Sequence, residues 1–250
     1  MNAQDFLALD RDLAAGNVSL DRDTVLHYAL NCFRHPAYEE MQAVKQISML
    51  SVETLMVCRA YGLSAKTGVL EIGAYIGGST VALGKGLHLA GRKPMATIDP
   101  GGSVLDQPFL PSADILADWH KNVSSFGLEG VSKLVKGYSQ DKRVISEVKE
   151  VAAGSKFDVF FMDTNGEVHQ ALNDYGGMLA DDCLVILDDY YNVIGADTKA
   201  QKTARQVHEL MAIGLLEQYA LVPFSTWFGR LNKSGIKKEG RLSRLVRKFR

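Results

Sequence analysis

Three aspartates at the ends of two apolar runs have a spacing that could support cation chemistry. Asp163 ends the run 157–163, and Asp188 and Asp189 end the run 183–189. If these runs are neighbouring parallel strands, their ends lie roughly 5 Å apart, and carboxylates that close repel one another unless a cation lies among them. Such hard oxygen ligands suit Mg²⁺. In the alternative interpretation, Asp163 is a turn residue and one of the later acids is solvated.

A glycine-rich segment, 71–79, follows the earlier apolar run 68–73 and could bind a ligand. Its glycines, among them Gly73 and Gly77, let the backbone turn sharply and approach a ligand closely. Their spacing, G-x-x-x-G-G, differs from the G-x-G-x-x-G pattern that holds a pyrophosphate at a helix N-terminus. The carboxylate of Glu71 would repel a pyrophosphate, but it can pair with an ammonium group. The segment therefore favours a ligand with an amino-acid end, although plain packing would also explain its glycines.

Polar residues after the next two apolar runs could complete a nucleoside site. Asp99 lies at the end of the run 94–100, where a carboxylate can accept hydrogen bonds from both hydroxyls of a ribose. Ser139 and Gln140 follow the run 133–137 and can hydrogen-bond an adenine edge. Each residue also has a simpler interpretation, since Asp99 could cap a turn and Ser139 could cap the following helix.

Short apolar runs and helical stretches alternate from residue 67 onward, and this alternation positions the polar residues. The predicted strands are 68–73, 94–100, 133–137, 157–163 and 183–189. The predicted helices are 79–89, 113–126, 141–151, 167–179 and 198–213. Strands this apolar, separated by helices, indicate a parallel sheet covered on both faces. Ligands of such sheets bind beyond the carboxyl ends of the strands.

The two ends of the chain depart from this alternation. Segments 216–224 and 225–231 predict an antiparallel hairpin, and helical spacing at 23–33 and 39–61 predicts helices, with Gly62 as a stop. The expected fold is therefore α/β, a doubly wound and mostly parallel seven-stranded sheet with a C-terminal antiparallel hairpin and N-terminal helical additions. The expected division of the chain is a helical cap at 1–66, a ligand-binding domain at 67–231 and a basic tail at 232–250.

Composition narrows the class of protein. The 250 residues are 46% hydrophobic and 23% charged, as in an ordinary globular protein, and no apolar stretch approaches the ~18 residues of a membrane span. The start of the chain lacks a signal-peptide pattern. Cys32, Cys58 and Cys183 have no metal-binding spacing. We therefore expect a cytoplasmic protein with reduced thiols.

Taken together, these segments resemble class I S-adenosylmethionine-dependent methyltransferases, and within them the metal-dependent O-methyltransferase branch. LEIGAYIGGS (70–79) looks like the first motif of catechol O-methyltransferase, and GYSQD (137–141) resembles its adenine loop. FFMDTNGEVHQALNDYGGML (160–179) and VILDDYYN (185–192) resemble bacterial enzymes that methylate sugar or natural-product hydroxyls. The resemblance covers about residues 66–230.

The resemblance implies a Rossmann-like fold and assigns roles to matching positions. The residues that it assigns to S-adenosylmethionine are Glu71, Gly73, Ala74, Tyr75, Gly77, Ser79, Asp99, Ser139, Gln140 and Asp163. The methionine part would lie against the glycine-rich segment, the ribose at Asp99 and the adenine at Ser139 and Gln140. Asp163, Asp188 and Asp189 match the family's metal ligands, so Mg²⁺ is the expected metal.

One departure from the family concerns the general base. The third position after Asp163, where the family has His or Lys, is Gly166, and Asn165 replaces the motif's second Asp. Glu167 and His169 are the candidates for a replacement base, although His169 could equally face solvent. Asp163 is the third candidate catalytic residue, through its position at the metal.

The expected function is Mg²⁺-dependent O-methylation of a hydroxyl on a small natural product or saccharide, in a biosynthetic role. A metal would lower the pKa of the acceptor hydroxyl and fix its position. Three alternatives stay open: a metal-independent N- or C-methyltransferase, a protein that binds S-adenosylmethionine without turnover, and a NAD-dependent oxidoreductase. The glycine spacing argues against the last of these.

Charge is unevenly distributed and bears on the expected partners. Residues 232–250 hold eight Lys or Arg and one acid, a net charge of +7, which leaves −8 on residues 1–231. We therefore expect no nucleic acid in the main cleft. The end of the tail, 240–250, could form a basic amphipathic helix with peripheral membrane contact, or it could be disordered and solvated. Helical N-terminal additions on this fold suggest a homo-oligomer, by analogy only.

Overall fold

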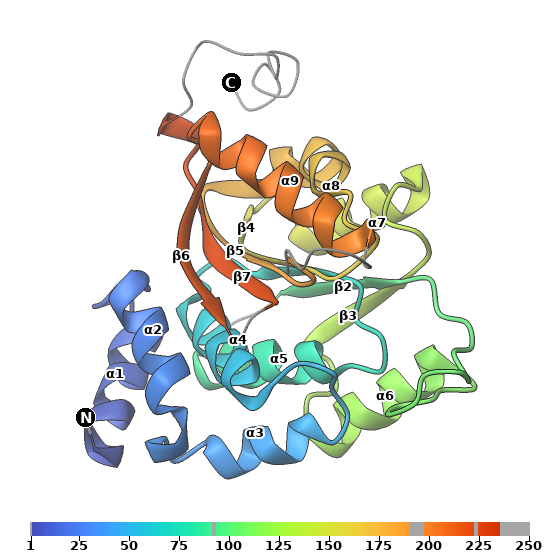
Figure 1. Cartoon of the computed structure of the whole chain (residues 1–250). Coiled ribbons are helices and arrows are strands. Elements are labelled where there is room, and N and C mark those ends of the chain that lie inside the picture. Colours follow the sequence, from blue (N-terminus) through green and yellow to red (C-terminus); the bar gives the residue numbers. More distant parts are fainter. Residues whose placement is uncertain (1, 92–93, 191–197, 223–224, 236–250) are drawn as a thin grey trace.

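The computed structural model describes residues 2–91, 94–190, 198–222 and 225–235 (Figure 1). The strands are β1 (Val69–Ile72), β2 (Met95–Asp99), β3 (Ser132–Lys136), β4 (Phe157–Met162), β5 (Leu179–Leu187), β6 (Leu216–Val222) and β7 (Thr226–Leu231). The α-helices are α1 (Ala3–Ala15), α2 (Arg22–Asn31), α3 (Tyr38–Lys45), α4 (Val52–Ser64), α5 (Gly78–Leu89), α6 (Ile115–Ser125), α7 (Lys142–Ala152), α8 (Val168–Tyr175) and α9 (Thr198–Ala212).

The strands form one seven-stranded sheet in the order β3-β2-β1-β4-β5-β7-β6. Strands β1 to β5 pair in parallel, whereas β7 pairs antiparallel with both β5 and β6. The order reverses between β1 and β4, so the loops after these strands diverge and leave space at their carboxyl ends. The predicted fold class and the C-terminal hairpin are confirmed.

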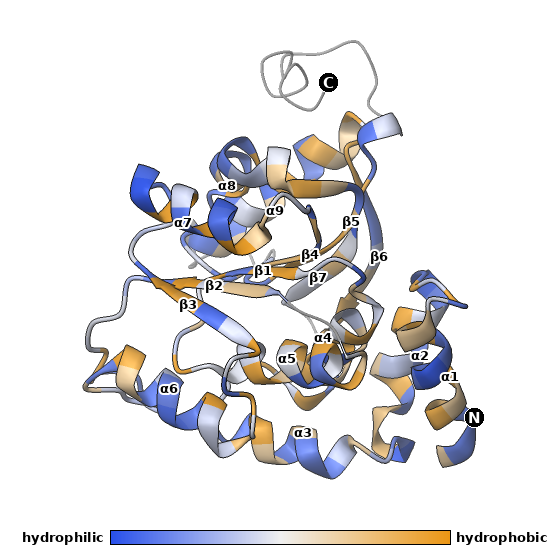
Figure 2. Ribbon diagram, turned by 180° about the vertical axis from the view of Figure 1, so that it is seen from behind, coloured by the Kyte–Doolittle hydropathy of each residue, from blue (hydrophilic) through white to orange (hydrophobic). Residues whose placement is uncertain are grey.

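Helices cover both faces of the sheet, as its apolar strands require. One hydrophobic core joins the sheet to α1 through α6, with Tyr28, Leu55 and Trp119 among its buried members. The other joins the opposite face to α7, α8 and α9, through Val148, Leu172 and other residues. Figure 2 shows the apolar central strands between helices of mixed polar and apolar surface. Because both faces are covered, polar ligands must reach the strands at their ends.

The N-terminal part differs from the prediction in two respects. The stretch predicted as one helix at 39–61 is two helices, α3 and α4, because Ser51 accepts a hydrogen bond from the backbone N–H of Thr54 and begins a new helix. Gly62, predicted as a stop, lies inside α4. A Cβ on Gly62 would lie 2.1 Å from the carbonyl oxygen of Leu83. This glycine therefore allows α4 and α5 to pack closely.

A buried ionic cluster ties α1 to α4. The carboxylate of Asp10 lies 2.7 Å from Nη2 of Arg59 and accepts a hydrogen bond of 2.5 Å from the hydroxyl of Tyr28. His35 lies 3.2 Å from the same carboxylate. All four side chains belong to the N-terminal helices and their connections, so the helical cap is fixed by charge as well as by apolar contact.

Strand β5 begins at Leu179, earlier than the run predicted at 183–189. Leu179 is buried and pairs with Phe157 of β4, whereas Asp181 and Asp182 point to solvent. The prediction was based on continuous apolar runs, and these two exposed acids interrupt the run, so the predicted strand began too late. Consequently, the helix predicted at 167–179 ends earlier, with α8 followed by a short 3₁₀ turn, Gly176–Met178.

Some predictions concern parts of the chain that the structure does not describe. None of the helices among the described residues is long and apolar enough to cross a membrane. The membrane contact predicted for the tail concerns mainly residues 236–250, which lie outside the described residues. That contact, the domain division and the homo-oligomer stay predictions.

Candidate active site

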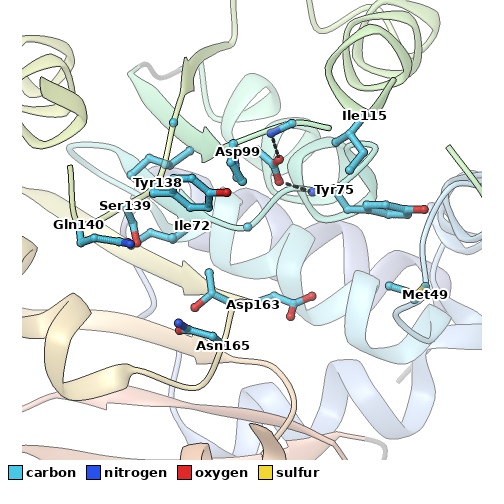
Figure 3. A pocket seen from close by; sticks show the side chains of 16 residues that line it. Met49, Ile72, Tyr75, Asp99, Ile115, Tyr138, Ser139, Gln140, Asp163 and Asn165 are labelled. Atoms are coloured by element: carbon cyan, nitrogen blue, oxygen red, sulfur yellow. Dashed lines mark hydrogen bonds between the residues drawn. The ribbon is translucent and has the colours of Figure 1, made fainter. Parts of the chain in front are cut away.

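A cavity of about 490 Å³ opens at the carboxyl ends of β1 to β4, within the size range of small-molecule and cofactor sites. Its lining residues are Met49, Ile72, Gly73, Tyr75, Ile98, Asp99, Pro100, Gly101, Ile115, Gly137, Tyr138, Ser139, Gln140, Asp163, Thr164 and Asn165. Figure 3 shows Asp163 and Asn165 on the side of the cavity opposite Asp99 and Tyr138. The cavity thus lies where the sequence places the ligand.

Backbone strain and close approach shape the loop after β1. Gly73 has φ +85°, and a Cβ there would lie 1.8 Å from the carbonyl oxygen of Asp163. Tyr75 adopts φ +49°, which is uncommon for a residue with a side chain. Gly77, with φ +97°, precedes the first residue of α5. Glycine at 73 is therefore what allows the ends of β1 and β4 to meet beneath the cavity.

Asp99 holds this loop through its carboxylate. Its Oδ2 accepts hydrogen bonds from the backbone N–H groups of Ala74 at 3.1 Å and Tyr75 at 2.9 Å, and its Oδ1 accepts one from Gly101 at 2.8 Å. Figure 3 shows the bond between Asp99 and Tyr75. Oδ1 accepts only one of these bonds and keeps a further lone pair, and Asp99 lines the cavity. The position predicted for a ribose-binding acid therefore also fixes the loops on both sides.

The loop after β3, which contains the residues predicted to bind adenine, is held in place by α8. The hydroxyl of Tyr175 on α8 donates a 2.6 Å hydrogen bond to the backbone carbonyl of Ser139. The loop presents Ser139 and Gln140 to the cavity, together with the ring of Tyr138, which is 61% exposed. Ile98 adds an apolar wall. The cavity here therefore offers both apolar surface and hydrogen-bonding groups, which suits a flat ring with polar edges.

Four residues predicted for the cofactor lie outside the cavity lining: Glu71, Ala74, Gly77 and Ser79. Glu71 is fully buried, and its carboxylate accepts hydrogen bonds from the hydroxyls of Ser79 at 2.6 Å, Thr80 at 2.6 Å and Thr97 at 2.8 Å. Burial outweighs these bonds and raises the pKa of Glu71 to about 7. The structure therefore gives Glu71 the hydroxyls of its neighbours as partners, rather than a direct contact with a ligand.

We expect Glu71→Gln to change the pH dependence of stability. The pKa of Glu71 is about 4.5 when unfolded and about 7 when folded. The folded state therefore holds the proton more tightly, and the wild type loses stability as pH rises from 4.5 to 7, by about 3 kcal/mol. The glutamine variant lacks this loss. Urea unfolding of both proteins across this pH range measures the difference.

The same variant also tests the ligand contact predicted from the sequence. If Glu71 stays in its buried network, Glu71→Gln keeps its affinity for S-adenosylhomocysteine. A loss of about tenfold or more, the size of a charge-assisted hydrogen bond, would mean that Glu71 contacts the ligand's ammonium group. Parallel pH profiles for the two proteins would contradict the buried carboxylate.

Asp163, Asp188 and Asp189 converge as predicted, at the ends of β4 and β5. One carboxylate oxygen from each lies within 4.8 Å of the others. Asp189 adopts φ +53°, which turns the chain at the strand end, and Asp188 accepts a 2.6 Å hydrogen bond from the hydroxyl of Thr226. Burial, with the neighbouring acids, raises the pKa of both Asp163 and Asp188. The cluster therefore needs positive charge.

Lys199 of α9 supplies positive charge to this cluster. Its Nζ lies 2.8 Å from Oδ1 of Asp163 and also pairs with the carboxylate of Asp189. Three carboxylates are the right donors for Mg²⁺, but an ammonium group already binds two of them. With Lys199 in this position, the residues present do not fit a divalent cation.

Glu167 and His169, the predicted replacement bases, do not join the cluster. Glu167 pairs with Lys202 of α9, and Nε2 of His169 lies 3.5 Å from Glu209 of the same helix. Neither residue lines the cavity. Both side chains connect the start of α8 to α9. In this structure they therefore hold two helices together and do not face the cavity.

Lys199 is the site residue that the sequence analysis missed. Two signals could have found it: the glycine at 166 in place of a base, and a lysine in the first turn of the helix that follows Asp189. Tyr138, Thr164 and other unpredicted lining residues lie next to predicted ones along the chain. Nothing about these residue types by themselves indicates a binding site.

Residues 70–190 match a family described as a methyltransferase domain. No curated protein matches the chain. Solved structures share its fold. The S-adenosylhomocysteine-bound methyltransferase PaMTH1 of Podospora anserina is 16% identical with a TM-score of 0.56, and the match covers 79% of this chain and 88% of that one.

Two further structures have similar scores. A putative caffeoyl-CoA O-methyltransferase of Staphylococcus aureus is 15% identical with a TM-score of 0.56, over 78% of this chain and 91% of that one. The O-methyltransferase TomG of Streptomyces achromogenes, in complex with S-adenosylmethionine, is 15% identical with a TM-score of 0.52, over 93% and 99%. At these identities the likeness shows the fold alone.

Proposed function

We propose that this chain transfers the methyl group of S-adenosylmethionine to a hydroxyl group of a small molecule, since residues 70–190 match a methyltransferase-domain family and the chain shares the fold of a solved methyltransferase. The observation that carries the proposal is the cavity at the carboxyl ends of β1 to β4. It joins Asp99 and the adenine loop at one side to Asp163 at the other. The cavity could therefore hold a nucleoside and present its reactive end to an acidic cluster.

The lining residues support one orientation of the cofactor. The loop at Gly73 and Tyr75 would hold the methionine end, Asp99 the ribose hydroxyls, and Ser139 and Gln140 the adenine edge. When bound, S-adenosylmethionine supplies a methyl group activated by its positively charged sulfur. The protein has then to align the acceptor oxygen with that methyl group and to exclude competing water.

Features at the Met49 and Tyr75 side of the cavity support a small acceptor with apolar parts. Met49 lines the cavity, and the hydroxyl of Tyr75 donates a hydrogen bond to the carbonyl of Leu110 in the loop between β2 and α6. Leu105 and Phe109 of this loop are 69% and 83% exposed. Exposed apolar side chains beside a cavity suit a hydrophobic or ring-shaped acceptor. The acidic body of the chain supports a partner that is not a nucleic acid.

Two routes to a reactive acceptor hydroxyl differ in what balances the acidic cluster. In the route predicted from the sequence, Asp163, Asp188 and Asp189 bind Mg²⁺, and their convergence within 4.8 Å supports it. In the other route, Lys199 provides the positive charge, and its contacts with Asp163 and Asp189 support this one. The occupied carboxylates favour the second route.

The proposal is tested by incubating the full chain with methyl-labelled S-adenosylmethionine and a panel of acceptors. The panel pairs hydroxylated rings with matched amines and with analogues that lack the hydroxyl. Label transfer only to hydroxyl-bearing acceptors supports O-methylation. Transfer to amines or carbon would instead assign N- or C-methylation, and cofactor binding without transfer to any acceptor would favour a non-catalytic binding protein.

A further inference from the structure

The acidic cluster contains a cation that belongs to the chain itself. Nζ of Lys199 lies 2.8 Å from Oδ1 of Asp163 and pairs with Asp189, while Asp188 accepts a hydrogen bond from Thr226. Each of the three carboxylates therefore has a partner within the chain. A metal ion would have to displace Lys199 from two of them.

The ammonium group of Lys199 lies between two carboxylates, 2.8 Å from Oδ1 of Asp163 and in an ion pair with Asp189. The side chain is 33% exposed, so the pair is partly shielded from solvent. A divalent cation placed among the same oxygens would lie close to this ammonium group and be repelled by it.

Gly166 explains why this lysine can reach the cluster. A Cβ at Gly166 would lie 2.8 Å from the carbonyl oxygen of Lys199 and 2.9 Å from Oγ1 of Thr203. The residue also has φ +76°, which a side chain disfavours. Any larger residue at 166 would push the first turns of α9 away from the loop after β4. The absence of a side chain at 166 and the position of Lys199 are therefore geometrically linked.

Other contacts hold α9 in the same place. Lys202 pairs with Glu167, and the backbone N–H of His169 donates a 2.7 Å hydrogen bond to Oε1 of Gln206. These contacts join α9 to the start of α8. On α9 they involve Lys202 and Gln206, about one and two helical turns after Lys199. The backbone position of Lys199 thus follows from the packing of the whole helix α9.

We propose that the ε-ammonium group of Lys199 takes the place of a divalent cation in this acidic cluster, so that the protein binds no metal there and acts without one. The statement about action rests on the proposed methyl transfer, whereas the statement about binding does not. Asp163 belongs both to the cluster and to the cavity wall. Lys199 therefore brings its positive charge next to the acceptor end of the cavity.

The test uses Mn²⁺ as the probe and the full chain without cofactor. Electron paramagnetic resonance and calorimetry measure Mn²⁺ binding to the wild type, Lys199→Met, and the control Lys202→Met, which removes a lysine of the same helix that pairs with Glu167. We expect no saturable binding to the wild type or the control. Lys199→Met should bind one Mn²⁺ at least about tenfold more tightly, because the repulsion between two nearby cations is gone.

A second variant assigns any new site. Lys199→Met with Asp189→Asn should lose the Mn²⁺ site that Lys199→Met gains. Circular dichroism and thermal unfolding accompany each variant. The wild type adds a measurement that needs no variant: methyl transfer after exhaustive chelation should stay within about twofold of the untreated rate, since no Lewis acid is removed.

Three results would overturn the proposal. The first is saturable Mn²⁺ binding to the wild type that Asp189→Asn removes, and the second is loss of turnover on chelation. The third is the absence of Mn²⁺ binding in a folded Lys199→Met, because the carboxylates would then not form a cation site at all. Mn²⁺ binding is measured without S-adenosylmethionine, so failure of the proposed function would be recognised separately, by the absence of cofactor binding.

Discussion

Replacing Asp163 with alanine should lower the rate of methyl transfer by at least about 100-fold, the usual cost of removing one group that aligns or polarises reacting atoms. Asp163 lines the cavity and holds Lys199 at 2.8 Å. Its loss would remove a polar wall at the acceptor end and release the ammonium group. The measurement is label transfer to the best acceptor from the panel, together with calorimetry of S-adenosylhomocysteine binding.

The cofactor affinity of Asp163→Ala should change little, because the ribose and adenine contacts are elsewhere in the cavity. A matched control is Asp181→Asn, near the start of β5, the strand that ends just before Asp188. The side chain of Asp181 is 72% exposed and does not line the cavity, so this variant should keep the wild-type rate. Normal turnover in Asp163→Ala would contradict the role given to the acidic cluster. A parallel loss of cofactor binding would make Asp163 a cofactor residue instead.

Replacing Arg59 with methionine should lower the free energy of unfolding by about 3–5 kcal/mol, the typical cost of leaving a buried charge without its partner. Arg59 is 4% exposed and Asp10 is 7% exposed. Although burial raises it, hydrogen bonds from His35 and Arg59 lower the pKa of Asp10 to about 2. Asp10 therefore stays ionised at neutral pH and would lose its main counter-charge. Urea unfolding at pH 7 measures the change.

Lys85→Met is the matched control for Arg59→Met. Lys85 pairs with Glu40 at 2.7 Å, but the carboxylate partner is 37% exposed, so the change should cost about 1 kcal/mol or less. The double variant Asp10→Asn with Arg59→Met should recover part of the lost stability, because no charge is left buried. Equal destabilisation by Arg59→Met and Lys85→Met would contradict the buried ionic cluster.

The sheet could be predicted because buried parallel strands are written as continuous apolar runs. The run that forms β4 is interrupted only by Asp158, whose side chain accepts hydrogen bonds from the backbone of 66–68. The convergence of Asp163, Asp188 and Asp189 followed from the rule that parallel strands end at one edge. The pattern of apolar residues was therefore sufficient to predict the position of a residue wherever a strand alone fixes that position.

Tertiary contacts decided the features that the sequence analysis missed. Lys199 lies 36 residues from Asp163, and the packing of α9 against Gly166 and the start of α8 brings the two together. Glu71 is a polar residue in an apolar strand, and whether it faces a ligand or Thr97 on the next strand depends on that strand's register. Gly62 was predicted to end a helix because glycine commonly does so. Its actual role is to allow close contact between α4 and α5, which the local sequence does not reveal.

The most direct test of the central claim is calorimetric titration of S-adenosylmethionine and S-adenosylhomocysteine into the full chain and into Asp99→Ala. We predict one binding site of micromolar affinity in the wild type. Asp99→Ala should weaken it by at least about tenfold, because both the ribose contact and the hydrogen bonds to the loop after β1 are lost. The absence of binding of either ligand to the folded wild type would contradict the claim that this cavity holds S-adenosylmethionine.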